Sequence, residues 1–312
     1  YVVGAFYIGD LATSIGRNSG DRLEGIGMID APDANDTAAA LVPAGVIVMY
    51  LAWQGGKYSR IFSVLMGAFI ANGLVLINSR GAFLGVVASL GLFLMHMIFS
   101  RHQKKGQKGT AIMMIVFGLA GALYVTDEVF WERMGTLKKS EDQEQISGAS
   151  RTVFWMRTFD MLESRPYGLG VWGYNELAPI YLTDEERGGV LNRAVHSTWF
   201  QAMSEIGYQG MLVFLLLLAA LFRQSREAKK YLIAQGDFAT YFKMLALECA
   251  LIGYLVAATF IDRFRAEILY WMILFLAIAI KLYYLQPLRE QSIAQSTKLS
   301  KRPGSVRGVG SE

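Results

Sequence analysis

The sequence predicts an all-α protein: a polytopic bundle of membrane helices, interrupted by one large, partly helical polar loop. Of its 312 residues, 53% are hydrophobic, and the mean hydropathy is +0.32. This apolar share exceeds that of typical soluble domains. The apolar residues also concentrate in runs close to the roughly 20 residues that cross a bilayer. Composition and clustering together indicate membrane helices rather than a soluble core.

Seven apolar runs are long enough to be spans. They cover residues 37–53, 61–77, 81–99, 110–125, 198–222, 241–261 and 268–284. Residues 1–15 are moderately apolar and could form the end of a further helix. Because the chain opens partway into an apolar segment at Tyr1, without a leader pattern, we expect it to lack earlier membrane helices.

The spans divide the chain into four parts. These are membrane helices in 1–126 with a short polar loop at 16–36, a large loop at 127–197, C-terminal membrane helices in 198–285, and a polar, basic tail at 286–312. We expect the tail to be disordered. The large loop is too long for a simple helix connection, and loops on rigid scaffolds often carry function. We therefore expect the site in this loop.

The basic residues predict an orientation. If the spans alternate, the basic segments 54–60, 101–108, 223–230 and the tail share one side, which the positive-inside rule assigns to the cytoplasm. The loops at 16–36, 78–80, 127–197 and 262–267 then share the outer side. The net charge of +4 is explained by these basic segments and does not indicate nucleic-acid binding.

Arginines on the outer side run against the usual bias. They are Arg80, Arg151, Arg157, Arg193, Arg263 and Arg265. A guanidinium binds phosphate through paired hydrogen bonds and stays charged at any relevant pH, so the group indicates an anionic ligand. The alternative is that these arginines anchor at lipid headgroups or pair with Asp160, Glu163 and Glu205.

The segment that starts at Arg151 has apolar residues near helical spacing. We expect an amphipathic helix there, lying on the membrane surface. Arg151 and Arg157 fall on different sides of such a helix.

His196 is the one histidine expected on the outer side. A neutral imidazole can act as a general base toward a hydroxyl at neutral pH. The alternative is an interfacial histidine without chemistry, which we assign to His96 and His102. The three histidines lack a metal-ligand spacing, and the single cysteine, Cys249, lies in a span, so neither a metal site nor a disulfide framework is expected.

The stretch 166–175 is rich in glycine and aromatic residues. Gly168 and Gly170 predict a tight turn whose backbone approaches a ligand. No strand precedes the turn, so it is not a dinucleotide-binding fingerprint. Trp172 and its neighbouring tyrosines could stack on sugar rings or belong to an interfacial aromatic belt.

These outer-side motifs together resemble the bacterial O-antigen ligase/polymerase family, which includes lipopolysaccharide O-antigen ligases, O-antigen polymerases and protein O-oligosaccharyltransferases. The similar segments are N-S-R-G-A-F-L-G at 78–85, R-x-x-x-W at 151–155, P-x-G-x-G at 166–170, the histidine at 196 with E-x-G-x-x-G at 205–210, and D-A-N-D-T-A-A-A-L at 33–41. Ser197 stands where the family usually has Asn, and Arg157 rivals Arg151 for the same role.

The resemblance implies a GT-C-like glycosyltransferase of the bacterial inner membrane, with its site facing the periplasm. Such enzymes transfer a glycan from undecaprenyl diphosphate to a hydroxyl of a glycan, lipid A-core or protein, without cofactor or metal, and the spans hold the polyprenyl chain. Arg80 and Arg151, assisted by Arg157 or Arg193, would stabilise the diphosphate, and His196 would be the base that takes the acceptor's proton or a group that orients the acceptor. Further substrate-binding residues would be Arg157, Arg193, Gly168, Gly170, Trp172 and Glu205.

Two other classes stay open. One is a transporter or flippase of polyprenyl-linked glycans, and the other is a non-catalytic component of a polysaccharide export assembly. A transporter often places charges near the membrane midplane within repeats. Here Glu248 is the one acid well inside a predicted span, and no internal repeat is visible.

Overall fold

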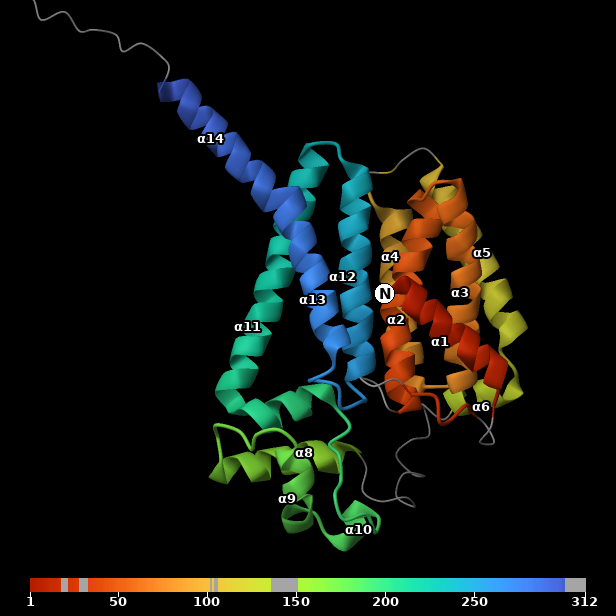
Figure 1. Cartoon of the computed structure of the whole chain (residues 1–312), viewed down its shortest axis with the longest axis vertical. Coiled ribbons are helices and arrows are strands. Elements are labelled where there is room, and N and C mark those ends of the chain that lie inside the picture. The colour runs from red at the N-terminus through yellow and green to blue at the C-terminus, as the bar shows by residue number, and fades with distance from the viewer. Residues whose placement is uncertain (18–21, 28–32, 102, 104–105, 136–150, 301–312) are drawn as a thin grey trace, which may run out of the picture.

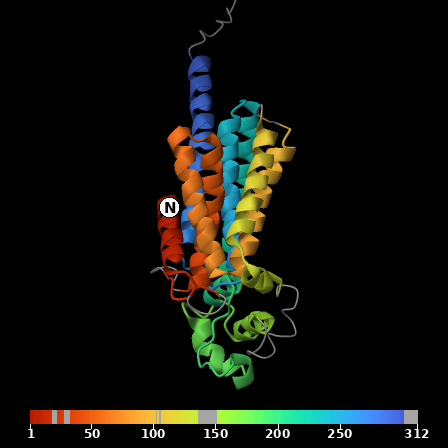
Figure 2. The same cartoon turned by 90° about the vertical axis from the view of Figure 1, so that its right-hand side faces the viewer.

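The structure, a computed structural model, describes residues 1–312 except 18–21, 28–32, 102, 104–105, 136–150 and 301–312. Its regular elements within those residues are helices. They form an elongated bundle with a smaller helical layer beneath one end and a single helix projecting from the other (Figure 1, Figure 2). The predicted all-α fold is confirmed.

Seven helices of the described chain are long and apolar enough to cross a membrane. They are α2 (Ala34–Gln54), α3 (Lys57–Ile77), α4 (Arg80–Phe99), α5 (Gln107–Val125), α11 (Thr198–Ala234), α12 (Phe238–Ala258) and α13 (Glu267–Ile280) with its continuation. A shorter apolar helix, α1 (Val2–Ile15), packs against α3. Each predicted span falls on one of the seven, so the multi-pass arrangement is confirmed.

Helices α2 and α12 are the most enclosed of the seven, and α5 is the least. Close packing of α4 on α12 depends on small residues. A Cβ built on Gly85 of α4 would lie 2.6 Å from the carbonyl oxygen of Gly253 in α12. Small residues let membrane helices approach this closely. The packing fixes the start of α4, where Arg80 lies, beside the end of α12.

The described residues of the large loop form α6 (Glu128–Gly135), α8 (Arg151–Ser164), α9 (Gly173–Tyr181) and α10 (Asp184–Arg187). Helices α8, α9 and α10 form the layer beneath the bundle (Figure 1). This layer has a small core of its own around Phe154, Met161 and Tyr174. The expected helix beginning at Arg151 is present, and a rigid layer rather than an extended loop carries the candidate residues.

Helix α11 is kinked at Gly207, whose φ of 68° and ψ of −174° are not helical. Before the kink α11 lies across the end of the bundle, and after it α11 runs along the bundle (Figure 1). The basic segment 223–230, expected as a connection, instead continues the helix. Its inward residues Leu221, Ser225 and Ala228 stay buried at helical spacing, so packing supports the extra turns.

The prediction of a disordered tail from residue 286 is wrong for its first part. The chain passes from α13 through a short π-helix, η3 (Lys281–Leu285), directly into α14 (Gln286–Ser300). Extending an existing helix adds hydrogen bonds without a new nucleus, which favours helix even in a polar sequence. Residues 301–312 lie outside the described residues.

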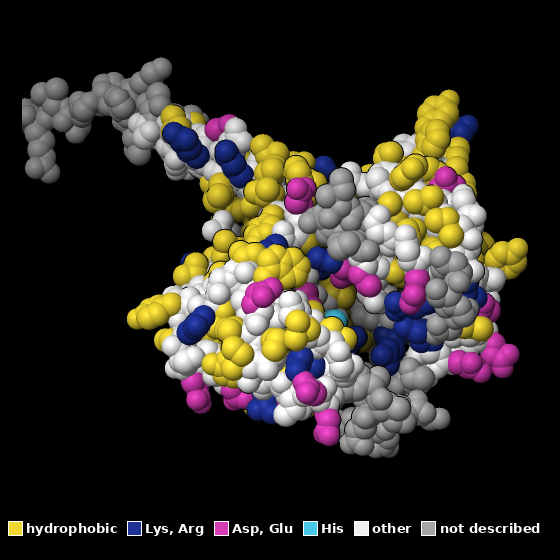
Figure 3. All heavy atoms as spheres, turned by 60° about the horizontal axis from the view of Figure 1, so that its bottom comes forward, with side chains coloured by type: hydrophobic (Ala, Val, Ile, Leu, Met, Phe, Trp, Pro, Cys, Tyr) yellow, Lys and Arg dark blue, Asp and Glu magenta, His cyan; other side chains and the backbone are white. Residues whose placement is uncertain are grey.

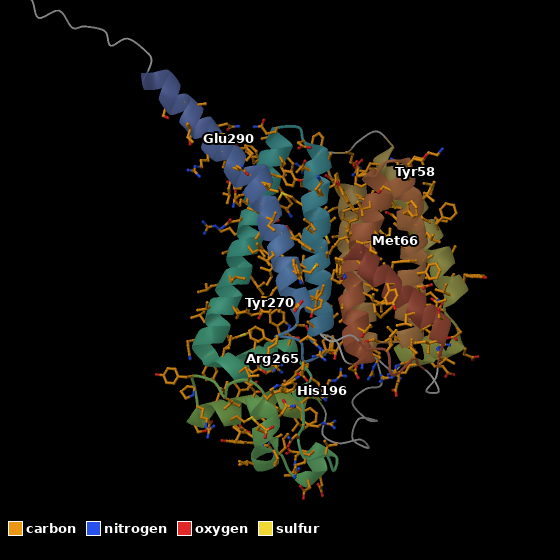
Figure 4. All side chains as sticks on the ribbon, in the orientation of Figure 1. Tyr58, Met66, His196, Arg265, Tyr270 and Glu290 are labelled. Atoms are coloured by element: carbon orange, nitrogen blue, oxygen red, sulfur yellow. The ribbon has the colours of Figure 1, made fainter. Side chains whose placement is uncertain are left out.

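The outer-side segments of the sequence prediction meet at one end of the bundle. The connections at 78–80 and 262–266 lie at the same end as the α8–α10 layer. The labelled His196 and Arg265 lie at this end, whereas Tyr58 and Glu290 lie toward the other (Figure 4). The candidate residues of five separate segments are therefore brought to one face.

Candidate active site

His196 lies at the junction between the α8–α10 layer and α11 (Figure 4). Its φ of 54° places it in the left-handed region, which residues other than glycine rarely adopt. Its neighbours Val195 and Ser197 are both buried. Such strain persists only where the surroundings impose it, and strained residues cluster at functional sites. The fold therefore holds His196 in a costly conformation that presents its imidazole.

Asp262, in the connection between α12 and α13, holds this conformation. Its Oδ1 accepts the backbone N–H of Ser197, the residue after His196, at 3.0 Å. Its Oδ2 lies 3.7 Å from Nδ1 of His196. That distance is longer than a hydrogen bond. Asp262 thus fixes the backbone turn and lies on the Nδ1 side of the imidazole. This leaves Nε2, on the other side of the ring, for a substrate.

The electrostatic surroundings keep His196 uncharged. Burial lowers the pKa of His196 to about 4, and the positive charges of Arg151 and Arg193 act in the same direction. At neutral pH the imidazole is therefore neutral and able to accept a proton. Burial raises the pKa of the Asp262 carboxyl, while the neighbouring backbone N–H groups of His196 and Ser197 and the charge of Arg263 act against this rise.

Arg193 places a positive charge next to His196 through Phe154. The buried Phe154 ring of α8 lies 6.1 Å from the His196 ring, centroid to centroid. The guanidinium carbon of Arg193 lies 5.1 Å from the centroid of the same phenyl ring. Within the described residues Arg193 makes no hydrogen bond or ion pair, and its Nε is buried. Its planar fork is therefore available to an anion.

Arg151 and the residue after Arg80 both lie beside Phe260, just after α12. The guanidinium carbon of Arg151 lies 6.0 Å from the Phe260 ring centroid. Gly81, next to Arg80, packs on the same residue, since a Cβ built there would lie 3.3 Å from Phe260 Cβ. Figure 3 shows Lys and Arg side chains gathered on this hollowed end of the molecule, near a histidine.

Arg157 is engaged differently from Arg193. Its terminal nitrogens bind Asp160 at 3.0 Å and Glu186 at 2.8 Å. The first contact lies within α8, and the second ties α8 to α10. The alternative considered for the outer-side arginines, pairing with acids, describes Arg157, whereas it does not describe Arg193.

The glycine turn contacts protein where a ligand was expected. Gly168 has a φ of 101°, and a Cβ built on it would lie 2.5 Å from the carbonyl oxygen of Glu205 in α11. Leu169 donates its N–H to Ser204 at 2.7 Å, which fixes the turn on α11. Gly170 also has a positive φ, of 79°, but open space lies beside it. The close approach at Gly168 is therefore to the kinked part of α11.

Trp172 and Glu205 lie together around Arg265. The guanidinium carbon of Arg265 lies 3.9 Å from the Trp172 ring centroid, and its Nε lies 3.4 Å from Oε1 of Glu205. The carbonyl of Trp172 accepts the backbone N–H of Glu176 at 3.1 Å, so this residue also begins α9. These contacts form a second group, distinct from the contacts around His196.

Sequence reasoning missed Asp262, Phe154 and the pairing role of Arg265 as parts of the site. Phe154 belongs to the apolar pattern of the helix that begins at Arg151, and that pattern predicts packing only. Asp262 was visible as a carboxylate at the outer end of a predicted span, on the same side as His196. That sidedness was the one available signal, because Asp262 lies far from His196 in sequence.

Among the described residues, no group of three or more His, Cys, Asp or Glu side chains is arranged to hold a metal ion. The chemistry that these residues offer is an uncharged imidazole, a carboxylate that positions it, and cations able to bind an anion. This combination suits transfer of a group away from an anionic leaving group.

The model of a family described as O-antigen ligase matches residues 61–215, from α3 into α11. The matched region includes Arg80, Arg151, Arg193 and His196, whereas Asp262 lies outside it. A search of curated proteins found no match. The multi-pass helical fold and the family match agree: residues 61–215 form a domain of the O-antigen ligase family, which is of the O-antigen ligase/polymerase type.

Proposed function

We propose that this protein transfers a glycan from undecaprenyl diphosphate to an acceptor hydroxyl, with the α8–α10 end of the bundle facing the periplasm of a bacterial inner membrane. The observation that carries the proposal is the grouping of the unpaired Arg193 with the neutral His196 in one site. A diphosphate needs cations, and a hydroxyl nucleophile needs a proton acceptor.

In the proposed reaction the acceptor oxygen attacks the anomeric carbon of the donor sugar. The bond between that carbon and the diphosphate oxygen breaks, and the electron pair leaves with the diphosphate. His196 takes the acceptor proton through Nε2, while Asp262, on the Nδ1 side, keeps the ring in place. No atom changes its oxidation state in this transfer, so the reaction needs no oxidant or reductant.

The arginines divide the stabilisation of the leaving group. Arg193 lies over the Phe154 ring, and the same ring lies beside the imidazole of His196. Arg151, which lies beside Phe260, and Arg80, whose neighbour Gly81 packs on the same residue, extend the positive charge toward the bundle. Charge develops on the diphosphate as the bond breaks, so cations already in place favour the transition state over the ground state. Arg157 has no part in this proposal, because two carboxylates neutralise it.

The proposed orientation follows from charge. Lys57, Arg60, Arg223 and Lys230 lie toward the end of the bundle opposite His196. Basic residues next to spans favour the cytoplasmic side. Glu248, the acid inside a span, binds Lys229 at 2.7 Å and also contacts Ser225. This local pairing gives no support to a transport pathway.

The test is transfer from a lipid-linked oligosaccharide by the purified full-length protein in EDTA. Wild type is compared with His196→Ala and Arg193→Ala, with Arg165→Ala as the matched control, since Arg165 is an exposed arginine of the same layer. We expect the two site variants to lose about 10²–10⁴-fold in rate and the control to keep its rate. Folded wild type that binds the donor but releases no undecaprenyl diphosphate would overturn the proposal in favour of transport or assembly.

A further inference from the structure

A second cationic group at the same end of the molecule takes no part in the proposed chemistry. It consists of Trp172, Arg265 and Glu205, which come from the glycine turn, the α12–α13 connection and the first part of α11. The question is whether these contacts only tie the segments together or also leave a surface for a ligand.

Trp172 is held as an open platform. Its φ of 63° is left-handed, and its carbonyl accepts the N–H of Glu176 at 3.1 Å at the start of α9. One face of the indole carries the guanidinium of Arg265 at 3.9 Å, yet the residue stays 53% exposed. A tryptophan that served packing alone would bury most of its large apolar surface. Here a strained backbone holds an exposed indole in place.

Arg265 is oriented but not saturated. Its Nε lies 3.4 Å from Oε1 of Glu205 without a hydrogen bond, and its guanidinium carbon lies over the indole. Within the described part of the chain, its terminal nitrogens donate no hydrogen bond. Gln201 donates from Nε2 to the same Oε1 of Glu205 at 3.2 Å. A guanidinium fixed in this way keeps its fork for a carboxylate or phosphate at little further cost in side-chain entropy.

The group lies where it could serve the same reaction. Glu205 is within electrostatic reach of Asp262, which lies 3.7 Å from His196. In Figure 4 the labelled Tyr270, Arg265 and His196 follow one another from the bundle toward the α8–α10 layer. Tyr270 belongs to a span helix, so the group adjoins the edge of the membrane-crossing part. A ligand there can be attached to a lipid and still reach His196.

We propose that Trp172 and Arg265 form an acceptor subsite for an anionic sugar unit. The sugar ring stacks on the open part of the indole, and a phosphate or carboxylate on that sugar binds the terminal nitrogens of Arg265. The assignment to the acceptor, rather than to any other glycan, rests on the proposed function. The donor diphosphate is already assigned to Arg193 and Arg151, and a transferase needs a second substrate beside its base.

The test is direct binding, without transfer. The full chain is prepared with 5-fluorotryptophan, and the Trp172 resonance is assigned by its loss in Trp172→Phe. The probes are glucose 1-phosphate, glucuronate, methyl glucoside and inorganic phosphate. We expect at least one anionic sugar to shift the Trp172 resonance, and the neutral sugar and inorganic phosphate to bind about 10-fold more weakly, since each meets half of the site. A shift with glucose 1-phosphate but not with glucuronate identifies the acidic group as a phosphate, and the reverse result identifies it as a carboxylate.

Two variants make the result decisive. Arg265→Gln should weaken the anionic sugar by about 10-fold or more and leave methyl glucoside unchanged, while Arg265→Lys, which keeps the charge but not the planar stack, should fall between. The resonance of Trp131, an exposed tryptophan of α6, is the internal control and should not move. No Trp172 response to either anionic sugar, or an equal response in Arg265→Gln, overturns the proposal. Because no transfer is measured, a failure of the proposed reaction leaves this result readable by itself.

Discussion

Gly168 and Gly207 meet backbone to backbone. A Cβ built on Gly168 would lie 2.7 Å from the nitrogen of Gly207, and one built on Gly207 would lie 2.6 Å from the nitrogen of Gly168. Both have a positive φ, 101° and 68°. The N–H of Tyr208 donates to the carbonyl of Pro166 at 3.1 Å across the same contact. The kink of α11 therefore comes from its pairing with the glycine turn.

Replacing Gly207 by alanine should destabilise the protein. A left-handed backbone costs an L-residue about 1–2 kcal/mol, and the new methyl group would also collide with the Pro166 carbonyl. We expect a clear drop in the melting temperature of the purified protein, measured by tryptophan fluorescence. Gly170→Ala is the matched control, because Gly170 has a φ of 79° but open space beside it. Equal drops in both variants would show that the steric contact contributes nothing.

The ion pair between Asp36 and Arg263 should contribute more to stability than any surface pair. It joins the start of α2 to the α12–α13 connection, and the Asp36 side chain is only 7% exposed. Removing one partner leaves a buried charge, which typically costs about 3–5 kcal/mol. We expect Arg263→Ala to lower the melting temperature strongly and the double variant Asp36→Leu/Arg263→Met to recover much of the loss.

The control for that prediction is an exposed pair. Lys230 and Glu227 lie 2.9 Å apart on α11, and both are well exposed. Lys230→Ala should change stability by no more than about 1 kcal/mol. If the melting temperature falls as far in Lys230→Ala as in Arg263→Ala, the buried Asp36–Arg263 pair does not contribute more to stability than an exposed pair.

The fold could be predicted because a membrane span is a local property. Each apolar run long enough to cross the bilayer forms a helix here. The ends of the helices were harder to predict from the sequence. The continuation of α11 beyond residue 222 and of α13 into α14 depends on packing and on helix propagation, which composition does not reveal.

The candidate site was only partly accessible from the sequence. The residue types and their common side were visible, but not which arginine is free. The sequence does not distinguish Arg157 from Arg193. In the structure, Arg157 binds two carboxylates, whereas Arg193 binds none among the described residues. The reason is long-range: Glu186 and Phe154 reach these arginines through the packing of α8, α10 and the following segment.

Asp262→Asn should lower the rate of transfer and leave donor binding unchanged. Asparagine keeps the shape and can still accept the N–H of Ser197, but the charge beside Nδ1 of His196 is lost. We expect kcat to fall by less than the roughly 10²–10⁴-fold typical of losing a base, with KM for the lipid-linked donor unchanged. Asp160→Asn is the control, since its carboxylate serves Arg157. A higher donor KM with an unchanged kcat would assign Asp262 to donor binding instead.

The pH dependence of transfer should reveal how the arginines act on His196. Burial and the charges of Arg151 and Arg193 lower the pKa of His196 from 6.5 to about 4 in the free protein. The base is lost when it becomes protonated, so kcat/KM should stay level below pH 6.5 and fall only toward pH 4. A bound diphosphate offsets the positive charges, which raises the pKa of His196 in the complex. The acid limb of kcat should therefore lie at higher pH than that of kcat/KM.

Arg193→Gln tests whether the charge of Arg193 helps to lower the pKa of His196. Removing one positive charge makes protonation of His196 easier, so the acid limb of kcat/KM should move to higher pH even though the maximal rate is lower. The measurement is the initial rate of release of undecaprenyl diphosphate across the acid range, with Arg165→Gln as the charge-matched control. If the limb stays in place or moves to lower pH in Arg193→Gln alone, the titrating group is not an imidazole beside Arg193, and the base must be sought elsewhere in the site.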